Sequence, residues 1–229
     1  MIRYIRKGMT IAMPLEKMDD FFNSRVDGYE EHMMKNVDGA GEYYRVAAGA
    51  FPQTPNMHII DLGAGTGLEL DEIFKINPSV NVTCIDMSPA MLRKLAGKFK
   101  NRNITTVLGS YFDYDFGNCS FDGAVSVQSL HHFPHDKKLE LYSGLCRGIK
   151  NGGFYIEADY YAPDQKYEDF YFAENKRLRE EQGIAEGEFY HYDTPCTISN
   201  QAKLFFEAGF SEVKLLKQIG CTGVLMMRK

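Results

Sequence analysis

Paired cysteines and long apolar runs are both missing from the sequence. Its five cysteines are odd in number, widely spaced and include no Cys-x-x-Cys pair, which speaks against a disulfide framework or a zinc site and for a reducing compartment. No run of about 18 apolar residues occurs, so we expect no membrane span. The start, from Met1 to Met13, is basic but lacks the apolar segment of a signal peptide. These absences predict a cytoplasmic protein with no membrane partner.

An excess of positive charge is also missing. The chain has 26 lysines and arginines against 31 aspartates and glutamates, a formal net charge of -5. Proteins that bind nucleic acid present a basic face to the phosphates, so no nucleic-acid partner is expected. The 229 residues, 44% hydrophobic and 25% charged, are ordinary for a folded protein and predict one large domain.

A regular alternation of strands and helices begins after Asn56. Five short apolar strands are expected at residues 57–62, 80–85, 104–108, 123–127 and 154–158. Helices are expected at 68–76, 89–100 and 136–149. Ser88 as N-cap and Pro89 as first helical residue start the second of these helices. A turn at Asn151-Gly152-Gly153 is expected to lead into the fifth strand. This order predicts a parallel sheet with right-handed crossovers and helices on both faces.

The segments before and after this core have other patterns. Residues 14–36 and 42–50 are helical in periodicity, which predicts an N-terminal helical lid over residues 1–50. Residues 160–195 fit no strand and contain a charged, aromatic-rich helix over 166–182. Because they follow the fifth strand at the edge where open α/β folds bind ligands, we expect an insertion on the acceptor side of the site.

The C-terminal part, residues 196–229, predicts a helix over 198–208 and two strands at 213–218 and 221–227. The link between these strands is so short that they must form an antiparallel hairpin. Around a cofactor-binding core at 56–160, the whole chain therefore predicts a single α/β domain. We expect a Rossmann-like seven-stranded sheet, mostly parallel with one antiparallel C-terminal strand, and helices on both faces.

Three glycines, Gly63, Gly65 and Gly67, lie between the first expected strand and helix. Glycines allow a tight turn and let a ligand approach the backbone. A dinucleotide fingerprint needs a further glycine where Leu68 stands, which counts against an NAD-binding loop. Asp61 would repel a pyrophosphate but can hold a cationic amino group, directly or through water. The loop therefore favours S-adenosylmethionine, which has an α-amino group and no phosphate.

An acidic residue, Asp86, ends the second expected strand. A carboxylate at this position can accept hydrogen bonds from both hydroxyls of a ribose, and Met87 is placed to pack on an adenine face. NAD sites share the acidic residue, so it supports a nucleoside ligand without deciding which one.

Together these motifs resemble those of class I S-adenosylmethionine-dependent methyltransferases of the small-molecule type. The matching stretches are 61–67, 86–88, 121–126, 129–132, 149–153 and 207–210, and a segment from Phe22 to Tyr29 resembles a helix that closes over the cofactor in such enzymes. The resemblance implies S-adenosylmethionine as cofactor, S-adenosylhomocysteine as product and a small-molecule acceptor. The residues expected to bind the cofactor are Arg25, Tyr29, Asp61, Gly63, Ala64, Gly65, Asp86, Met87, Ser110, Tyr111, Val127 and Gln128.

One departure from the family concerns the adenine contact. Many relatives carry Gly-Asp after the third strand, whereas this chain has Gly109-Ser110. Ser110 can still accept a hydrogen bond and Tyr111 can offer its backbone. Asp113 and Asp115 are nearby alternatives.

Methyl transfer from a sulfonium is an in-line displacement, for which the protein mainly supplies orientation and excludes water. A general base is needed only when the acceptor is a protonated oxygen or a poorly acidic nitrogen. His131, after the fourth strand, is our candidate for that catalytic base, with a helix cap or a cofactor contact as the other interpretations. His132 and His135 are expected to be structural, and residues 159–161 are expected to line the acceptor pocket or simply to end a strand.

Two further features of the insertion leave alternatives open. His191 with Asp193 hints at a metal, but the sequence shows no third ligand and none is expected. The stripe of Tyr167, Phe170 and Tyr171 is expected to pack along its helix, with an acceptor wall or a homodimer contact as alternatives.

Other functions compete with methyl transfer to a small molecule. One is a non-catalytic module that senses S-adenosylmethionine or S-adenosylhomocysteine, and another is an NAD-dependent oxidoreductase, which Asp61 and Leu68 disfavour. A third is methylation of RNA or protein. The residues from Val127 to Leu130 form no Asn-Pro-Pro-Tyr-type motif after the fourth strand, which counts against methylation of a base.

Overall fold

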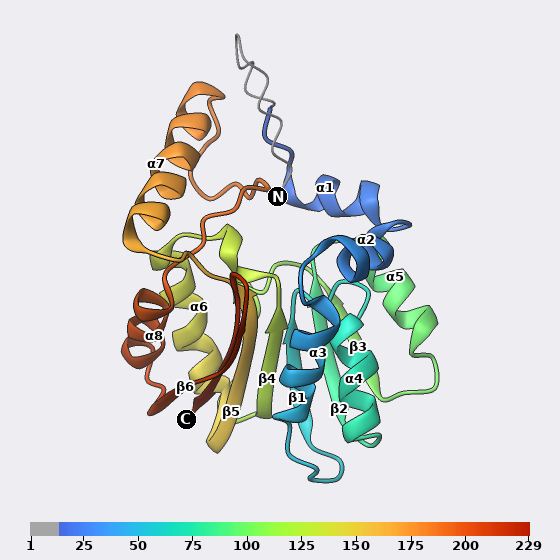
Figure 1. Cartoon of the computed structure of the whole chain (residues 1–229). Coiled ribbons are helices and arrows are strands. Elements are labelled where there is room, and N and C mark those ends of the chain that lie inside the picture. The colour runs from blue at the N-terminus through green and yellow to red at the C-terminus, as the bar shows by residue number, and fades with distance from the viewer. Residues whose placement is uncertain (1–13) are drawn as a thin grey trace.

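Seven strands form a single sheet in the computed structural model, which describes residues 14–229 (Figure 1). Their order across the sheet is β3-β2-β1-β4-β5-β7-β6. They are β1 (His58–Leu62), β2 (Asn81–Asp86), β3 (Ile104–Leu108), β4 (Phe121–Val127), β5 (Ile149–Tyr160), β6 (Glu212–Ile219) and β7 (Thr222–Arg228). The pairs among β1 to β5 are parallel, and β7 runs antiparallel to both β5 and β6. The expected sheet, with one antiparallel strand near its C-terminal edge, is confirmed.

Helices cover both faces of this sheet (Figure 1). They are α1 (Met18–Arg25), α2 (Tyr29–Asn36), α3 (Ala40–Gly49), α4 (Leu68–Ile76), α5 (Pro89–Lys98), α6 (His135–Gly148), α7 (Gln165–Glu181) and α8 (Ile198–Glu207), with a 3-10 turn at Leu130–His132. Side chains alternate along each strand, so Ile59 packs with α3, α4 and α5 while Ile60 packs with α6 and α8. Within residues 14–229, no helix combines the length and apolar character needed to cross a membrane.

The strand order reverses at the centre of the sheet. From β1 the chain proceeds outward through β2 to β3, and it then returns to place β4 on the other side of β1. Loops that leave the carboxyl ends of β1 and β4 therefore diverge, and ligands of open α/β sheets bind in the crevice between such loops. This topology brings the glycine loop after β1 beside the segment after β4.

The N-terminal segment forms two helices, α1 and α2, where the sequence predicts one continuous helix over residues 14–36. That prediction is wrong. α1 ends at Arg25, and α2 begins at Tyr29 after Gly28. The carbonyl of Val26, which α1 leaves without a helical partner, accepts a hydrogen bond from Lys94 Nζ at 3.1 Å. Glycine weakens a helix, and the lysine from α5 stabilises the break.

The fifth strand is longer than predicted. β5 begins at Ile149 and continues through Asn151-Gly152-Gly153, so the turn expected there is wrong. The pairing of β4 with β5 shifts register between Phe121 and Gly123. Gly152 adopts the left-handed conformation, with a φ of 76°, which allows the backbone to form this bulge while β5 continues.

The insertion between β5 and α8 contains α7 and then returns along the carboxyl edge of the sheet to α1 (Figure 1). Met18 N donates a hydrogen bond to the carbonyl of Phe189 at 3.0 Å, and His191 N donates to the carbonyl of Glu16 at 2.9 Å. The insertion and the N-terminal segment are thus joined at the end of the sheet where ligands are expected. Residues 1–13 of the expected lid lie outside the described residues.

The aromatic stripe of α7 packs only in part. Tyr167 and Tyr171 stack with ring centroids 4.5 Å apart, and the hydroxyl of Tyr167 lies 2.6 Å from that of Tyr160 on β5. Phe170 is 61% exposed. Tyr167 therefore anchors α7 to the end of β5, Tyr171 stacks on Tyr167, and Phe170 faces outward.

Candidate active site

A pocket opens where the strand order reverses. The empty space in it amounts to about 590 Å³, a figure that includes open solvent at its mouth. The loops after β1 to β4 form its floor, and α1, α2 and the insertion cover it. The residues that the sequence predicts to bind the cofactor and that line this pocket are Tyr29, Gly63, Gly65, Asp86, Met87, Ser110, Tyr111 and Gln128.

The glycine loop is held in a shape that other residues do not readily adopt. Gly63 has a φ of 73°, and a Cβ on it would lie 2.2 Å from Ser129 Oγ. Gly65 has a φ of 51°, and the nearest atoms to an added Cβ belong to Tyr29 at 3.8 Å. Gly63 is therefore required by the close approach of the segment after β4. Gly65 leaves its backbone open toward the pocket, as a bound cofactor needs.

Asp86 connects the glycine loop to the start of α5. Gly65 N donates to its Oδ2 at 2.8 Å, and Ser88 N donates to its Oδ1 at 2.8 Å. Burial raises the pKa of this carboxyl, while the two backbone donors oppose that rise. Each oxygen keeps a second lone pair, so the group can hold the loop and still accept hydrogen bonds from a ribose.

Asp61 lies fully buried beneath the loop, beside Glu69 of α4. Among the described residues, no backbone or side-chain N–H group donates a hydrogen bond to either oxygen of Asp61. The only group that can share a proton with it there is the neighbouring carboxyl of Glu69. Burial and the neighbouring carboxyl raise the pKa of Asp61 well above its usual value, and burial raises the pKa of Glu69 to about 7. Orphaned buried carboxylates of this kind fit a ligand that brings a positive charge, as the amino group of S-adenosylmethionine does.

The expected adenine end lies at the loop after β3. Ser110 lines the pocket, and its Oγ accepts a hydrogen bond from Phe112 N at 3.2 Å. The hydroxyl of Tyr111 lies 3.2 Å from Ser129 Oγ, which ties this loop to the segment after β4. Gln128 adopts a φ of 52° and donates from Nε2 to Thr222 Oγ1 at 3.1 Å.

An apolar and aromatic cover completes the pocket, and sequence reasoning missed most of it. Phe189 comes from the insertion, and Phe112 and Phe133 pack against it with centroids 5.3 Å away. The individual residues carry no motif, and they meet only because three separate loops converge. The lining residues not predicted as ligands of the cofactor are Met18, Phe22, Met91, Gly109, Phe112, Ser129, His132, Phe133 and Phe189.

Four of the predicted cofactor residues do not line the pocket, and one of them is Asp61, which lies buried beneath the glycine loop. Arg25 pairs with Glu16 at 2.8 Å and lies over the ring of Phe21 at 3.7 Å, which directs it away from Tyr29. Ala64 and Val127 are buried in the hydrophobic core under the loop. Arg25 lies in α1 and Tyr29 in α2, so the single helix that the sequence predicts over residues 14–36 does not bring them together.

His131 is buried in the 3-10 turn after β4. Its Nδ1 lies 2.5 Å from Asp159 Oδ1, while Asp159 Oδ2 accepts a hydrogen bond from Leu130 N at 2.8 Å. Its Nε2 faces Asp193 Oδ1 at 3.5 Å. Burial by itself lowers the pKa of His131, but the two carboxylates outweigh burial and raise that pKa to about 10. The imidazole is therefore cationic near neutral pH.

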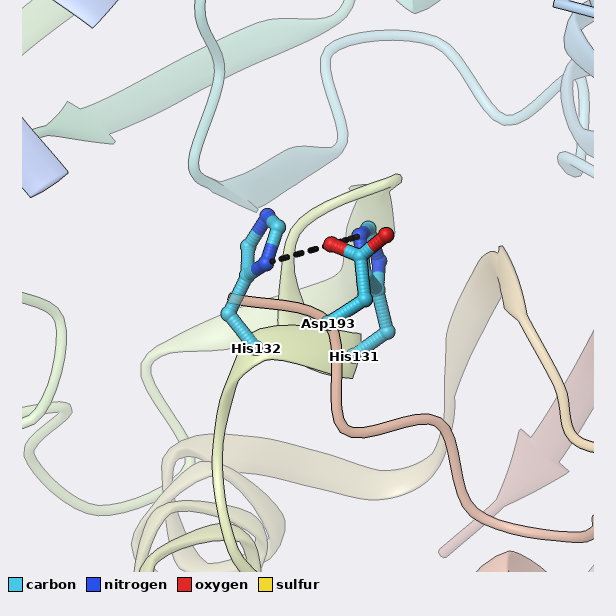
Figure 2. A group of neighbouring side chains, drawn as sticks. All are labelled: His131, His132 and Asp193. Atoms are coloured by element: carbon cyan, nitrogen blue, oxygen red, sulfur yellow. Dashed lines mark ion pairs between the residues drawn. The ribbon is translucent and has the colours of Figure 1, made fainter. Parts of the chain in front are cut away.

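Asp193 comes from the insertion and lies between His131 and His132 (Figure 2). His132 Nδ1 is 3.3 Å from the same Oδ1 atom, and His132 also lines the pocket. Burial and the charge of His131 lower the pKa of His132. The backbone holds this arrangement, because Thr194 N donates to the carbonyl of His131 at 2.7 Å. The sequence pattern pairs Asp193 with His191, whereas in the fold Asp193 contacts two histidines about 60 residues earlier in the chain.

Comparison with known proteins finds a methyltransferase domain in the chain. Residues 59–153 match the family described as methyltransferase domain. The carboxy-S-adenosyl-L-methionine synthase of Campylobacter fetus subsp. fetus (strain 82-40) is 23% identical over 151 residues, which cover 62% of this chain and 62% of that protein. The 24-methylenesterol C-methyltransferase 2 of Arabidopsis thaliana is 24% identical over 187 residues, which cover 75% of this chain and 50% of that protein. The chain thus spans between 50% and 62% of the length of these two relatives.

Solved structures show the same architecture. Human N-acetylserotonin methyltransferase in complex with S-adenosylmethionine is similar with a TM-score of 0.65 and 18% identity, over 92% of this chain and 56% of that one. At this identity the likeness concerns the fold. The family match over residues 59–153, the fold and the glycine-loop site together define the class: the chain contains a methyltransferase domain with the fold of the class I S-adenosylmethionine-dependent methyltransferases. S-adenosylmethionine is the cofactor of this class, and the orphaned carboxylates and open Gly65 backbone fit it.

Proposed function

We propose that the protein transfers the methyl group of S-adenosylmethionine to a small-molecule acceptor. The lining of the pocket carries the proposal, because an apolar aromatic cover lies over a floor built from the glycine loop and Asp86. The names of the similar proteins support a small-molecule acceptor: a sterol C-methyltransferase, an N-acetylserotonin methyltransferase and a carboxy-S-adenosyl-L-methionine synthase. The net charge of -5 supports it as well, since a nucleic-acid substrate favours a basic face.

We place the acceptor beside His132, on the side of the pocket where Asp193 and His131 lie. In this position His131 is the proposed catalytic residue. As a cation it can hold an acceptor oxygen through its Nε2–H, but it has no lone pair with which to take a proton. The base role expected from the sequence therefore requires that Nε2 first lose its proton. Asp159, through Nδ1, keeps the ring oriented in either state.

Thermal unfolding with three ligands tests the cofactor part of this proposal. S-adenosylmethionine or S-adenosylhomocysteine at about 100 times its dissociation constant is expected to stabilise the fold by roughly 2.7 kcal/mol. For a chain of this size that corresponds to a rise in Tm of about 5–10 °C. NAD is the control and is expected to give no rise, because the loop has Leu68 where an NAD site has glycine. A rise with NAD alone would contradict the assignment of the loop.

Proton release on binding tests the roles of Asp61 and Glu69. Burial holds both pKa values above their usual range, that of Glu69 at about 7, so the free pair retains a proton near neutral pH. A cationic amino group beside Asp61 favours the ionised carboxyls, so the complex holds fewer protons than the free protein. Affinity for S-adenosylhomocysteine is therefore expected to increase as the pH rises through about 7.

Calorimetric titration in buffers of different ionisation enthalpy measures this release directly. We expect up to about one proton released per site at pH 7, and we expect Asp61→Asn to abolish the release. Asp38→Asn, on an exposed turn, is the matched control and should release as many protons as the parent protein. A binding enthalpy independent of the buffer would place the amino group away from Asp61.

A further inference from the structure

Two histidines and a carboxylate converge on one point at the wall of the cofactor pocket (Figure 2). Nε2 of His131 and Nδ1 of His132 face the same oxygen, Oδ1 of Asp193, at 3.5 and 3.3 Å. One ligand atom from each of the three residues lies within 4.8 Å of the other two. We propose that this cluster binds a divalent transition-metal ion of the Zn²⁺ type through the two imidazoles and the carboxylate.

The separations fit a shared ion better than direct hydrogen bonds. Charged N–H groups approach carboxylate oxygens to about 2.7–2.9 Å, and both distances here are longer. Two ligands that each lie about 2.0–2.1 Å from a tetrahedral zinc are roughly 3.4 Å apart. The His–Asp separations match this value, so an ion can enter with little rearrangement and replace the proton on His131 Nε2.

The surroundings of His131 support the same conclusion. Asp159 holds Nδ1 at 2.5 Å and is itself fixed by Leu130 N and Tyr160 N, each at 2.8 Å. Histidines that bind metals commonly donate their other ring N–H to a carboxylate, which fixes the tautomer and directs the free nitrogen to the ion. Asp159 therefore acts as a positioning residue for Nε2.

Three protein ligands leave a coordination position open, as catalytic zinc sites do. Because His132 belongs both to the cluster and to the pocket wall, this position borders the acceptor space. If the proposed function holds, the ion takes the place of the Nε2–H of His131 as the group that holds the acceptor: an acceptor oxygen can take the open position, form a bond to the ion and release its proton to the solvent at neutral pH. Metal binding itself does not depend on that function.

A second cluster, of His135, Glu168 and Cys196, does not compete for the ion. Lys138 Nζ lies 3.2 Å from Cys196 Sγ, so an ammonium group already occupies the neighbourhood of the thiol. The oxygens of Glu168 accept hydrogen bonds from the backbone of Thr197 and from Asn200. A further cation there would meet positive charge and a carboxylate whose lone pairs are engaged.

Calorimetric titration of the full chain with Zn²⁺ alone tests the site, with Co²⁺ as a spectroscopic probe of tetrahedral geometry. We expect one Zn²⁺ per chain, visible Co²⁺ absorption of the tetrahedral type, and no binding of Mg²⁺, which prefers oxygen ligands. Asp193→Ala and His131→Ala are expected to weaken binding by at least about 100-fold. Asp159→Asn should weaken it by roughly 10- to 100-fold, as loss of an outer carboxylate partner does.

Two histidine variants are the matched controls. His135→Ala removes the second cluster and His32→Ala removes a surface histidine, and both should bind Zn²⁺ as the parent chain does. The proposal fails if the parent chain takes up no Zn²⁺, if Asp193→Ala binds it unchanged, or if His135→Ala abolishes binding. Circular dichroism and the Tm shift with S-adenosylhomocysteine show that each variant is folded. They also separate the two proposals, since Zn²⁺ binding without a ligand shift would overturn the proposed function and leave the metal site standing.

Discussion

Replacing Asp86 with alanine is expected to lower the affinity for S-adenosylhomocysteine by about 100-fold or more. Each hydrogen bond from a ribose hydroxyl to an ionised carboxylate contributes about 1.5–3 kcal/mol, and about 1.4 kcal/mol corresponds to a tenfold change. Two such bonds are lost. The glycine loop also loses its anchor, because Gly65 N and Ser88 N donate to the same carboxylate at 2.8 Å. Calorimetric titration with S-adenosylhomocysteine measures the loss.

Two controls make the Asp86 experiment specific. Asp86→Asn keeps one acceptor oxygen, so its loss of affinity should be smaller than that of the alanine variant. Asp38→Ala removes a carboxylate on an exposed turn outside the pocket, and it should bind like the parent protein. An affinity of Asp86→Ala within about fivefold of the parent would show that the ribose lies elsewhere.

Replacing Glu157 with alanine is expected to destabilise the fold by about 4–6 kcal/mol. Glu157 lies on β5, fully buried, and its two oxygens accept four hydrogen bonds. The donors are the hydroxyls of Tyr142, Tyr155 and Tyr161 and the amide of Gln201, at 2.7–2.8 Å. A buried donor left without its partner costs about 1–3 kcal/mol. At roughly 2–4 °C per kcal/mol, the Tm should fall by about 10–20 °C.

Conservative and surface variants identify the cause of that loss. Glu157→Gln retains a carbonyl oxygen and the side-chain volume, so it should lose less than half as much stability as Glu157→Ala. Glu140→Ala, on an exposed face of α6, should change the free energy of unfolding by no more than about 0.5 kcal/mol. If Glu157→Gln and Glu157→Ala unfold at the same temperature, the hydrogen bonds to Glu157 are not what stabilises this part of the core.

The stability and binding experiments address different parts of the molecule. Glu157 and its donors connect β5 to α6 and α8 on one face of the sheet, whereas Asp86 lies at the carboxyl edge that forms the pocket. An Asp86 variant that binds S-adenosylhomocysteine weakly but unfolds near the Tm of the ligand-free parent would therefore show that the substitution affects binding and not the stability of the fold.

Most of the architecture follows from patterns in the sequence. The alternation of apolar strands and amphipathic helices predicts the order and nearly all the bounds of the core elements, such as α4 at Leu68–Ile76. Ser88 caps α5 as expected, accepting a hydrogen bond from Met91 N at 3.1 Å. These features depend on interactions within a few residues along the chain, which a local pattern encodes. The two errors, at Gly28 and at Gly152, arise where contacts with distant elements decide whether a glycine ends an element or bends it.

The floor of the site was predictable for the same reason. Gly63, Gly65 and Asp86 occupy the ends of consecutive strands, and parallel topology places those ends together. Tyr29 and Ser110 also line the pocket, as the resemblance to the family implies. Arg25 does not, because its placement depended on a helix that the structure interrupts.

By itself the sequence determined the fold class and the cofactor, since glycine spacing, strand-end carboxylates and hydrophobic periodicity are local signals. Only the tertiary structure decided how the insertion completes the pocket. Phe189 lines the pocket and Asp193 contacts its wall residue His132 because the insertion folds back over the strand ends, and no periodicity marks where such a segment will return. The same folding gives Asp193 two histidine neighbours that lie about 60 residues away along the chain. Contacts of this range depend on how whole elements pack, so they exist only once the sheet and its covering segments are assembled.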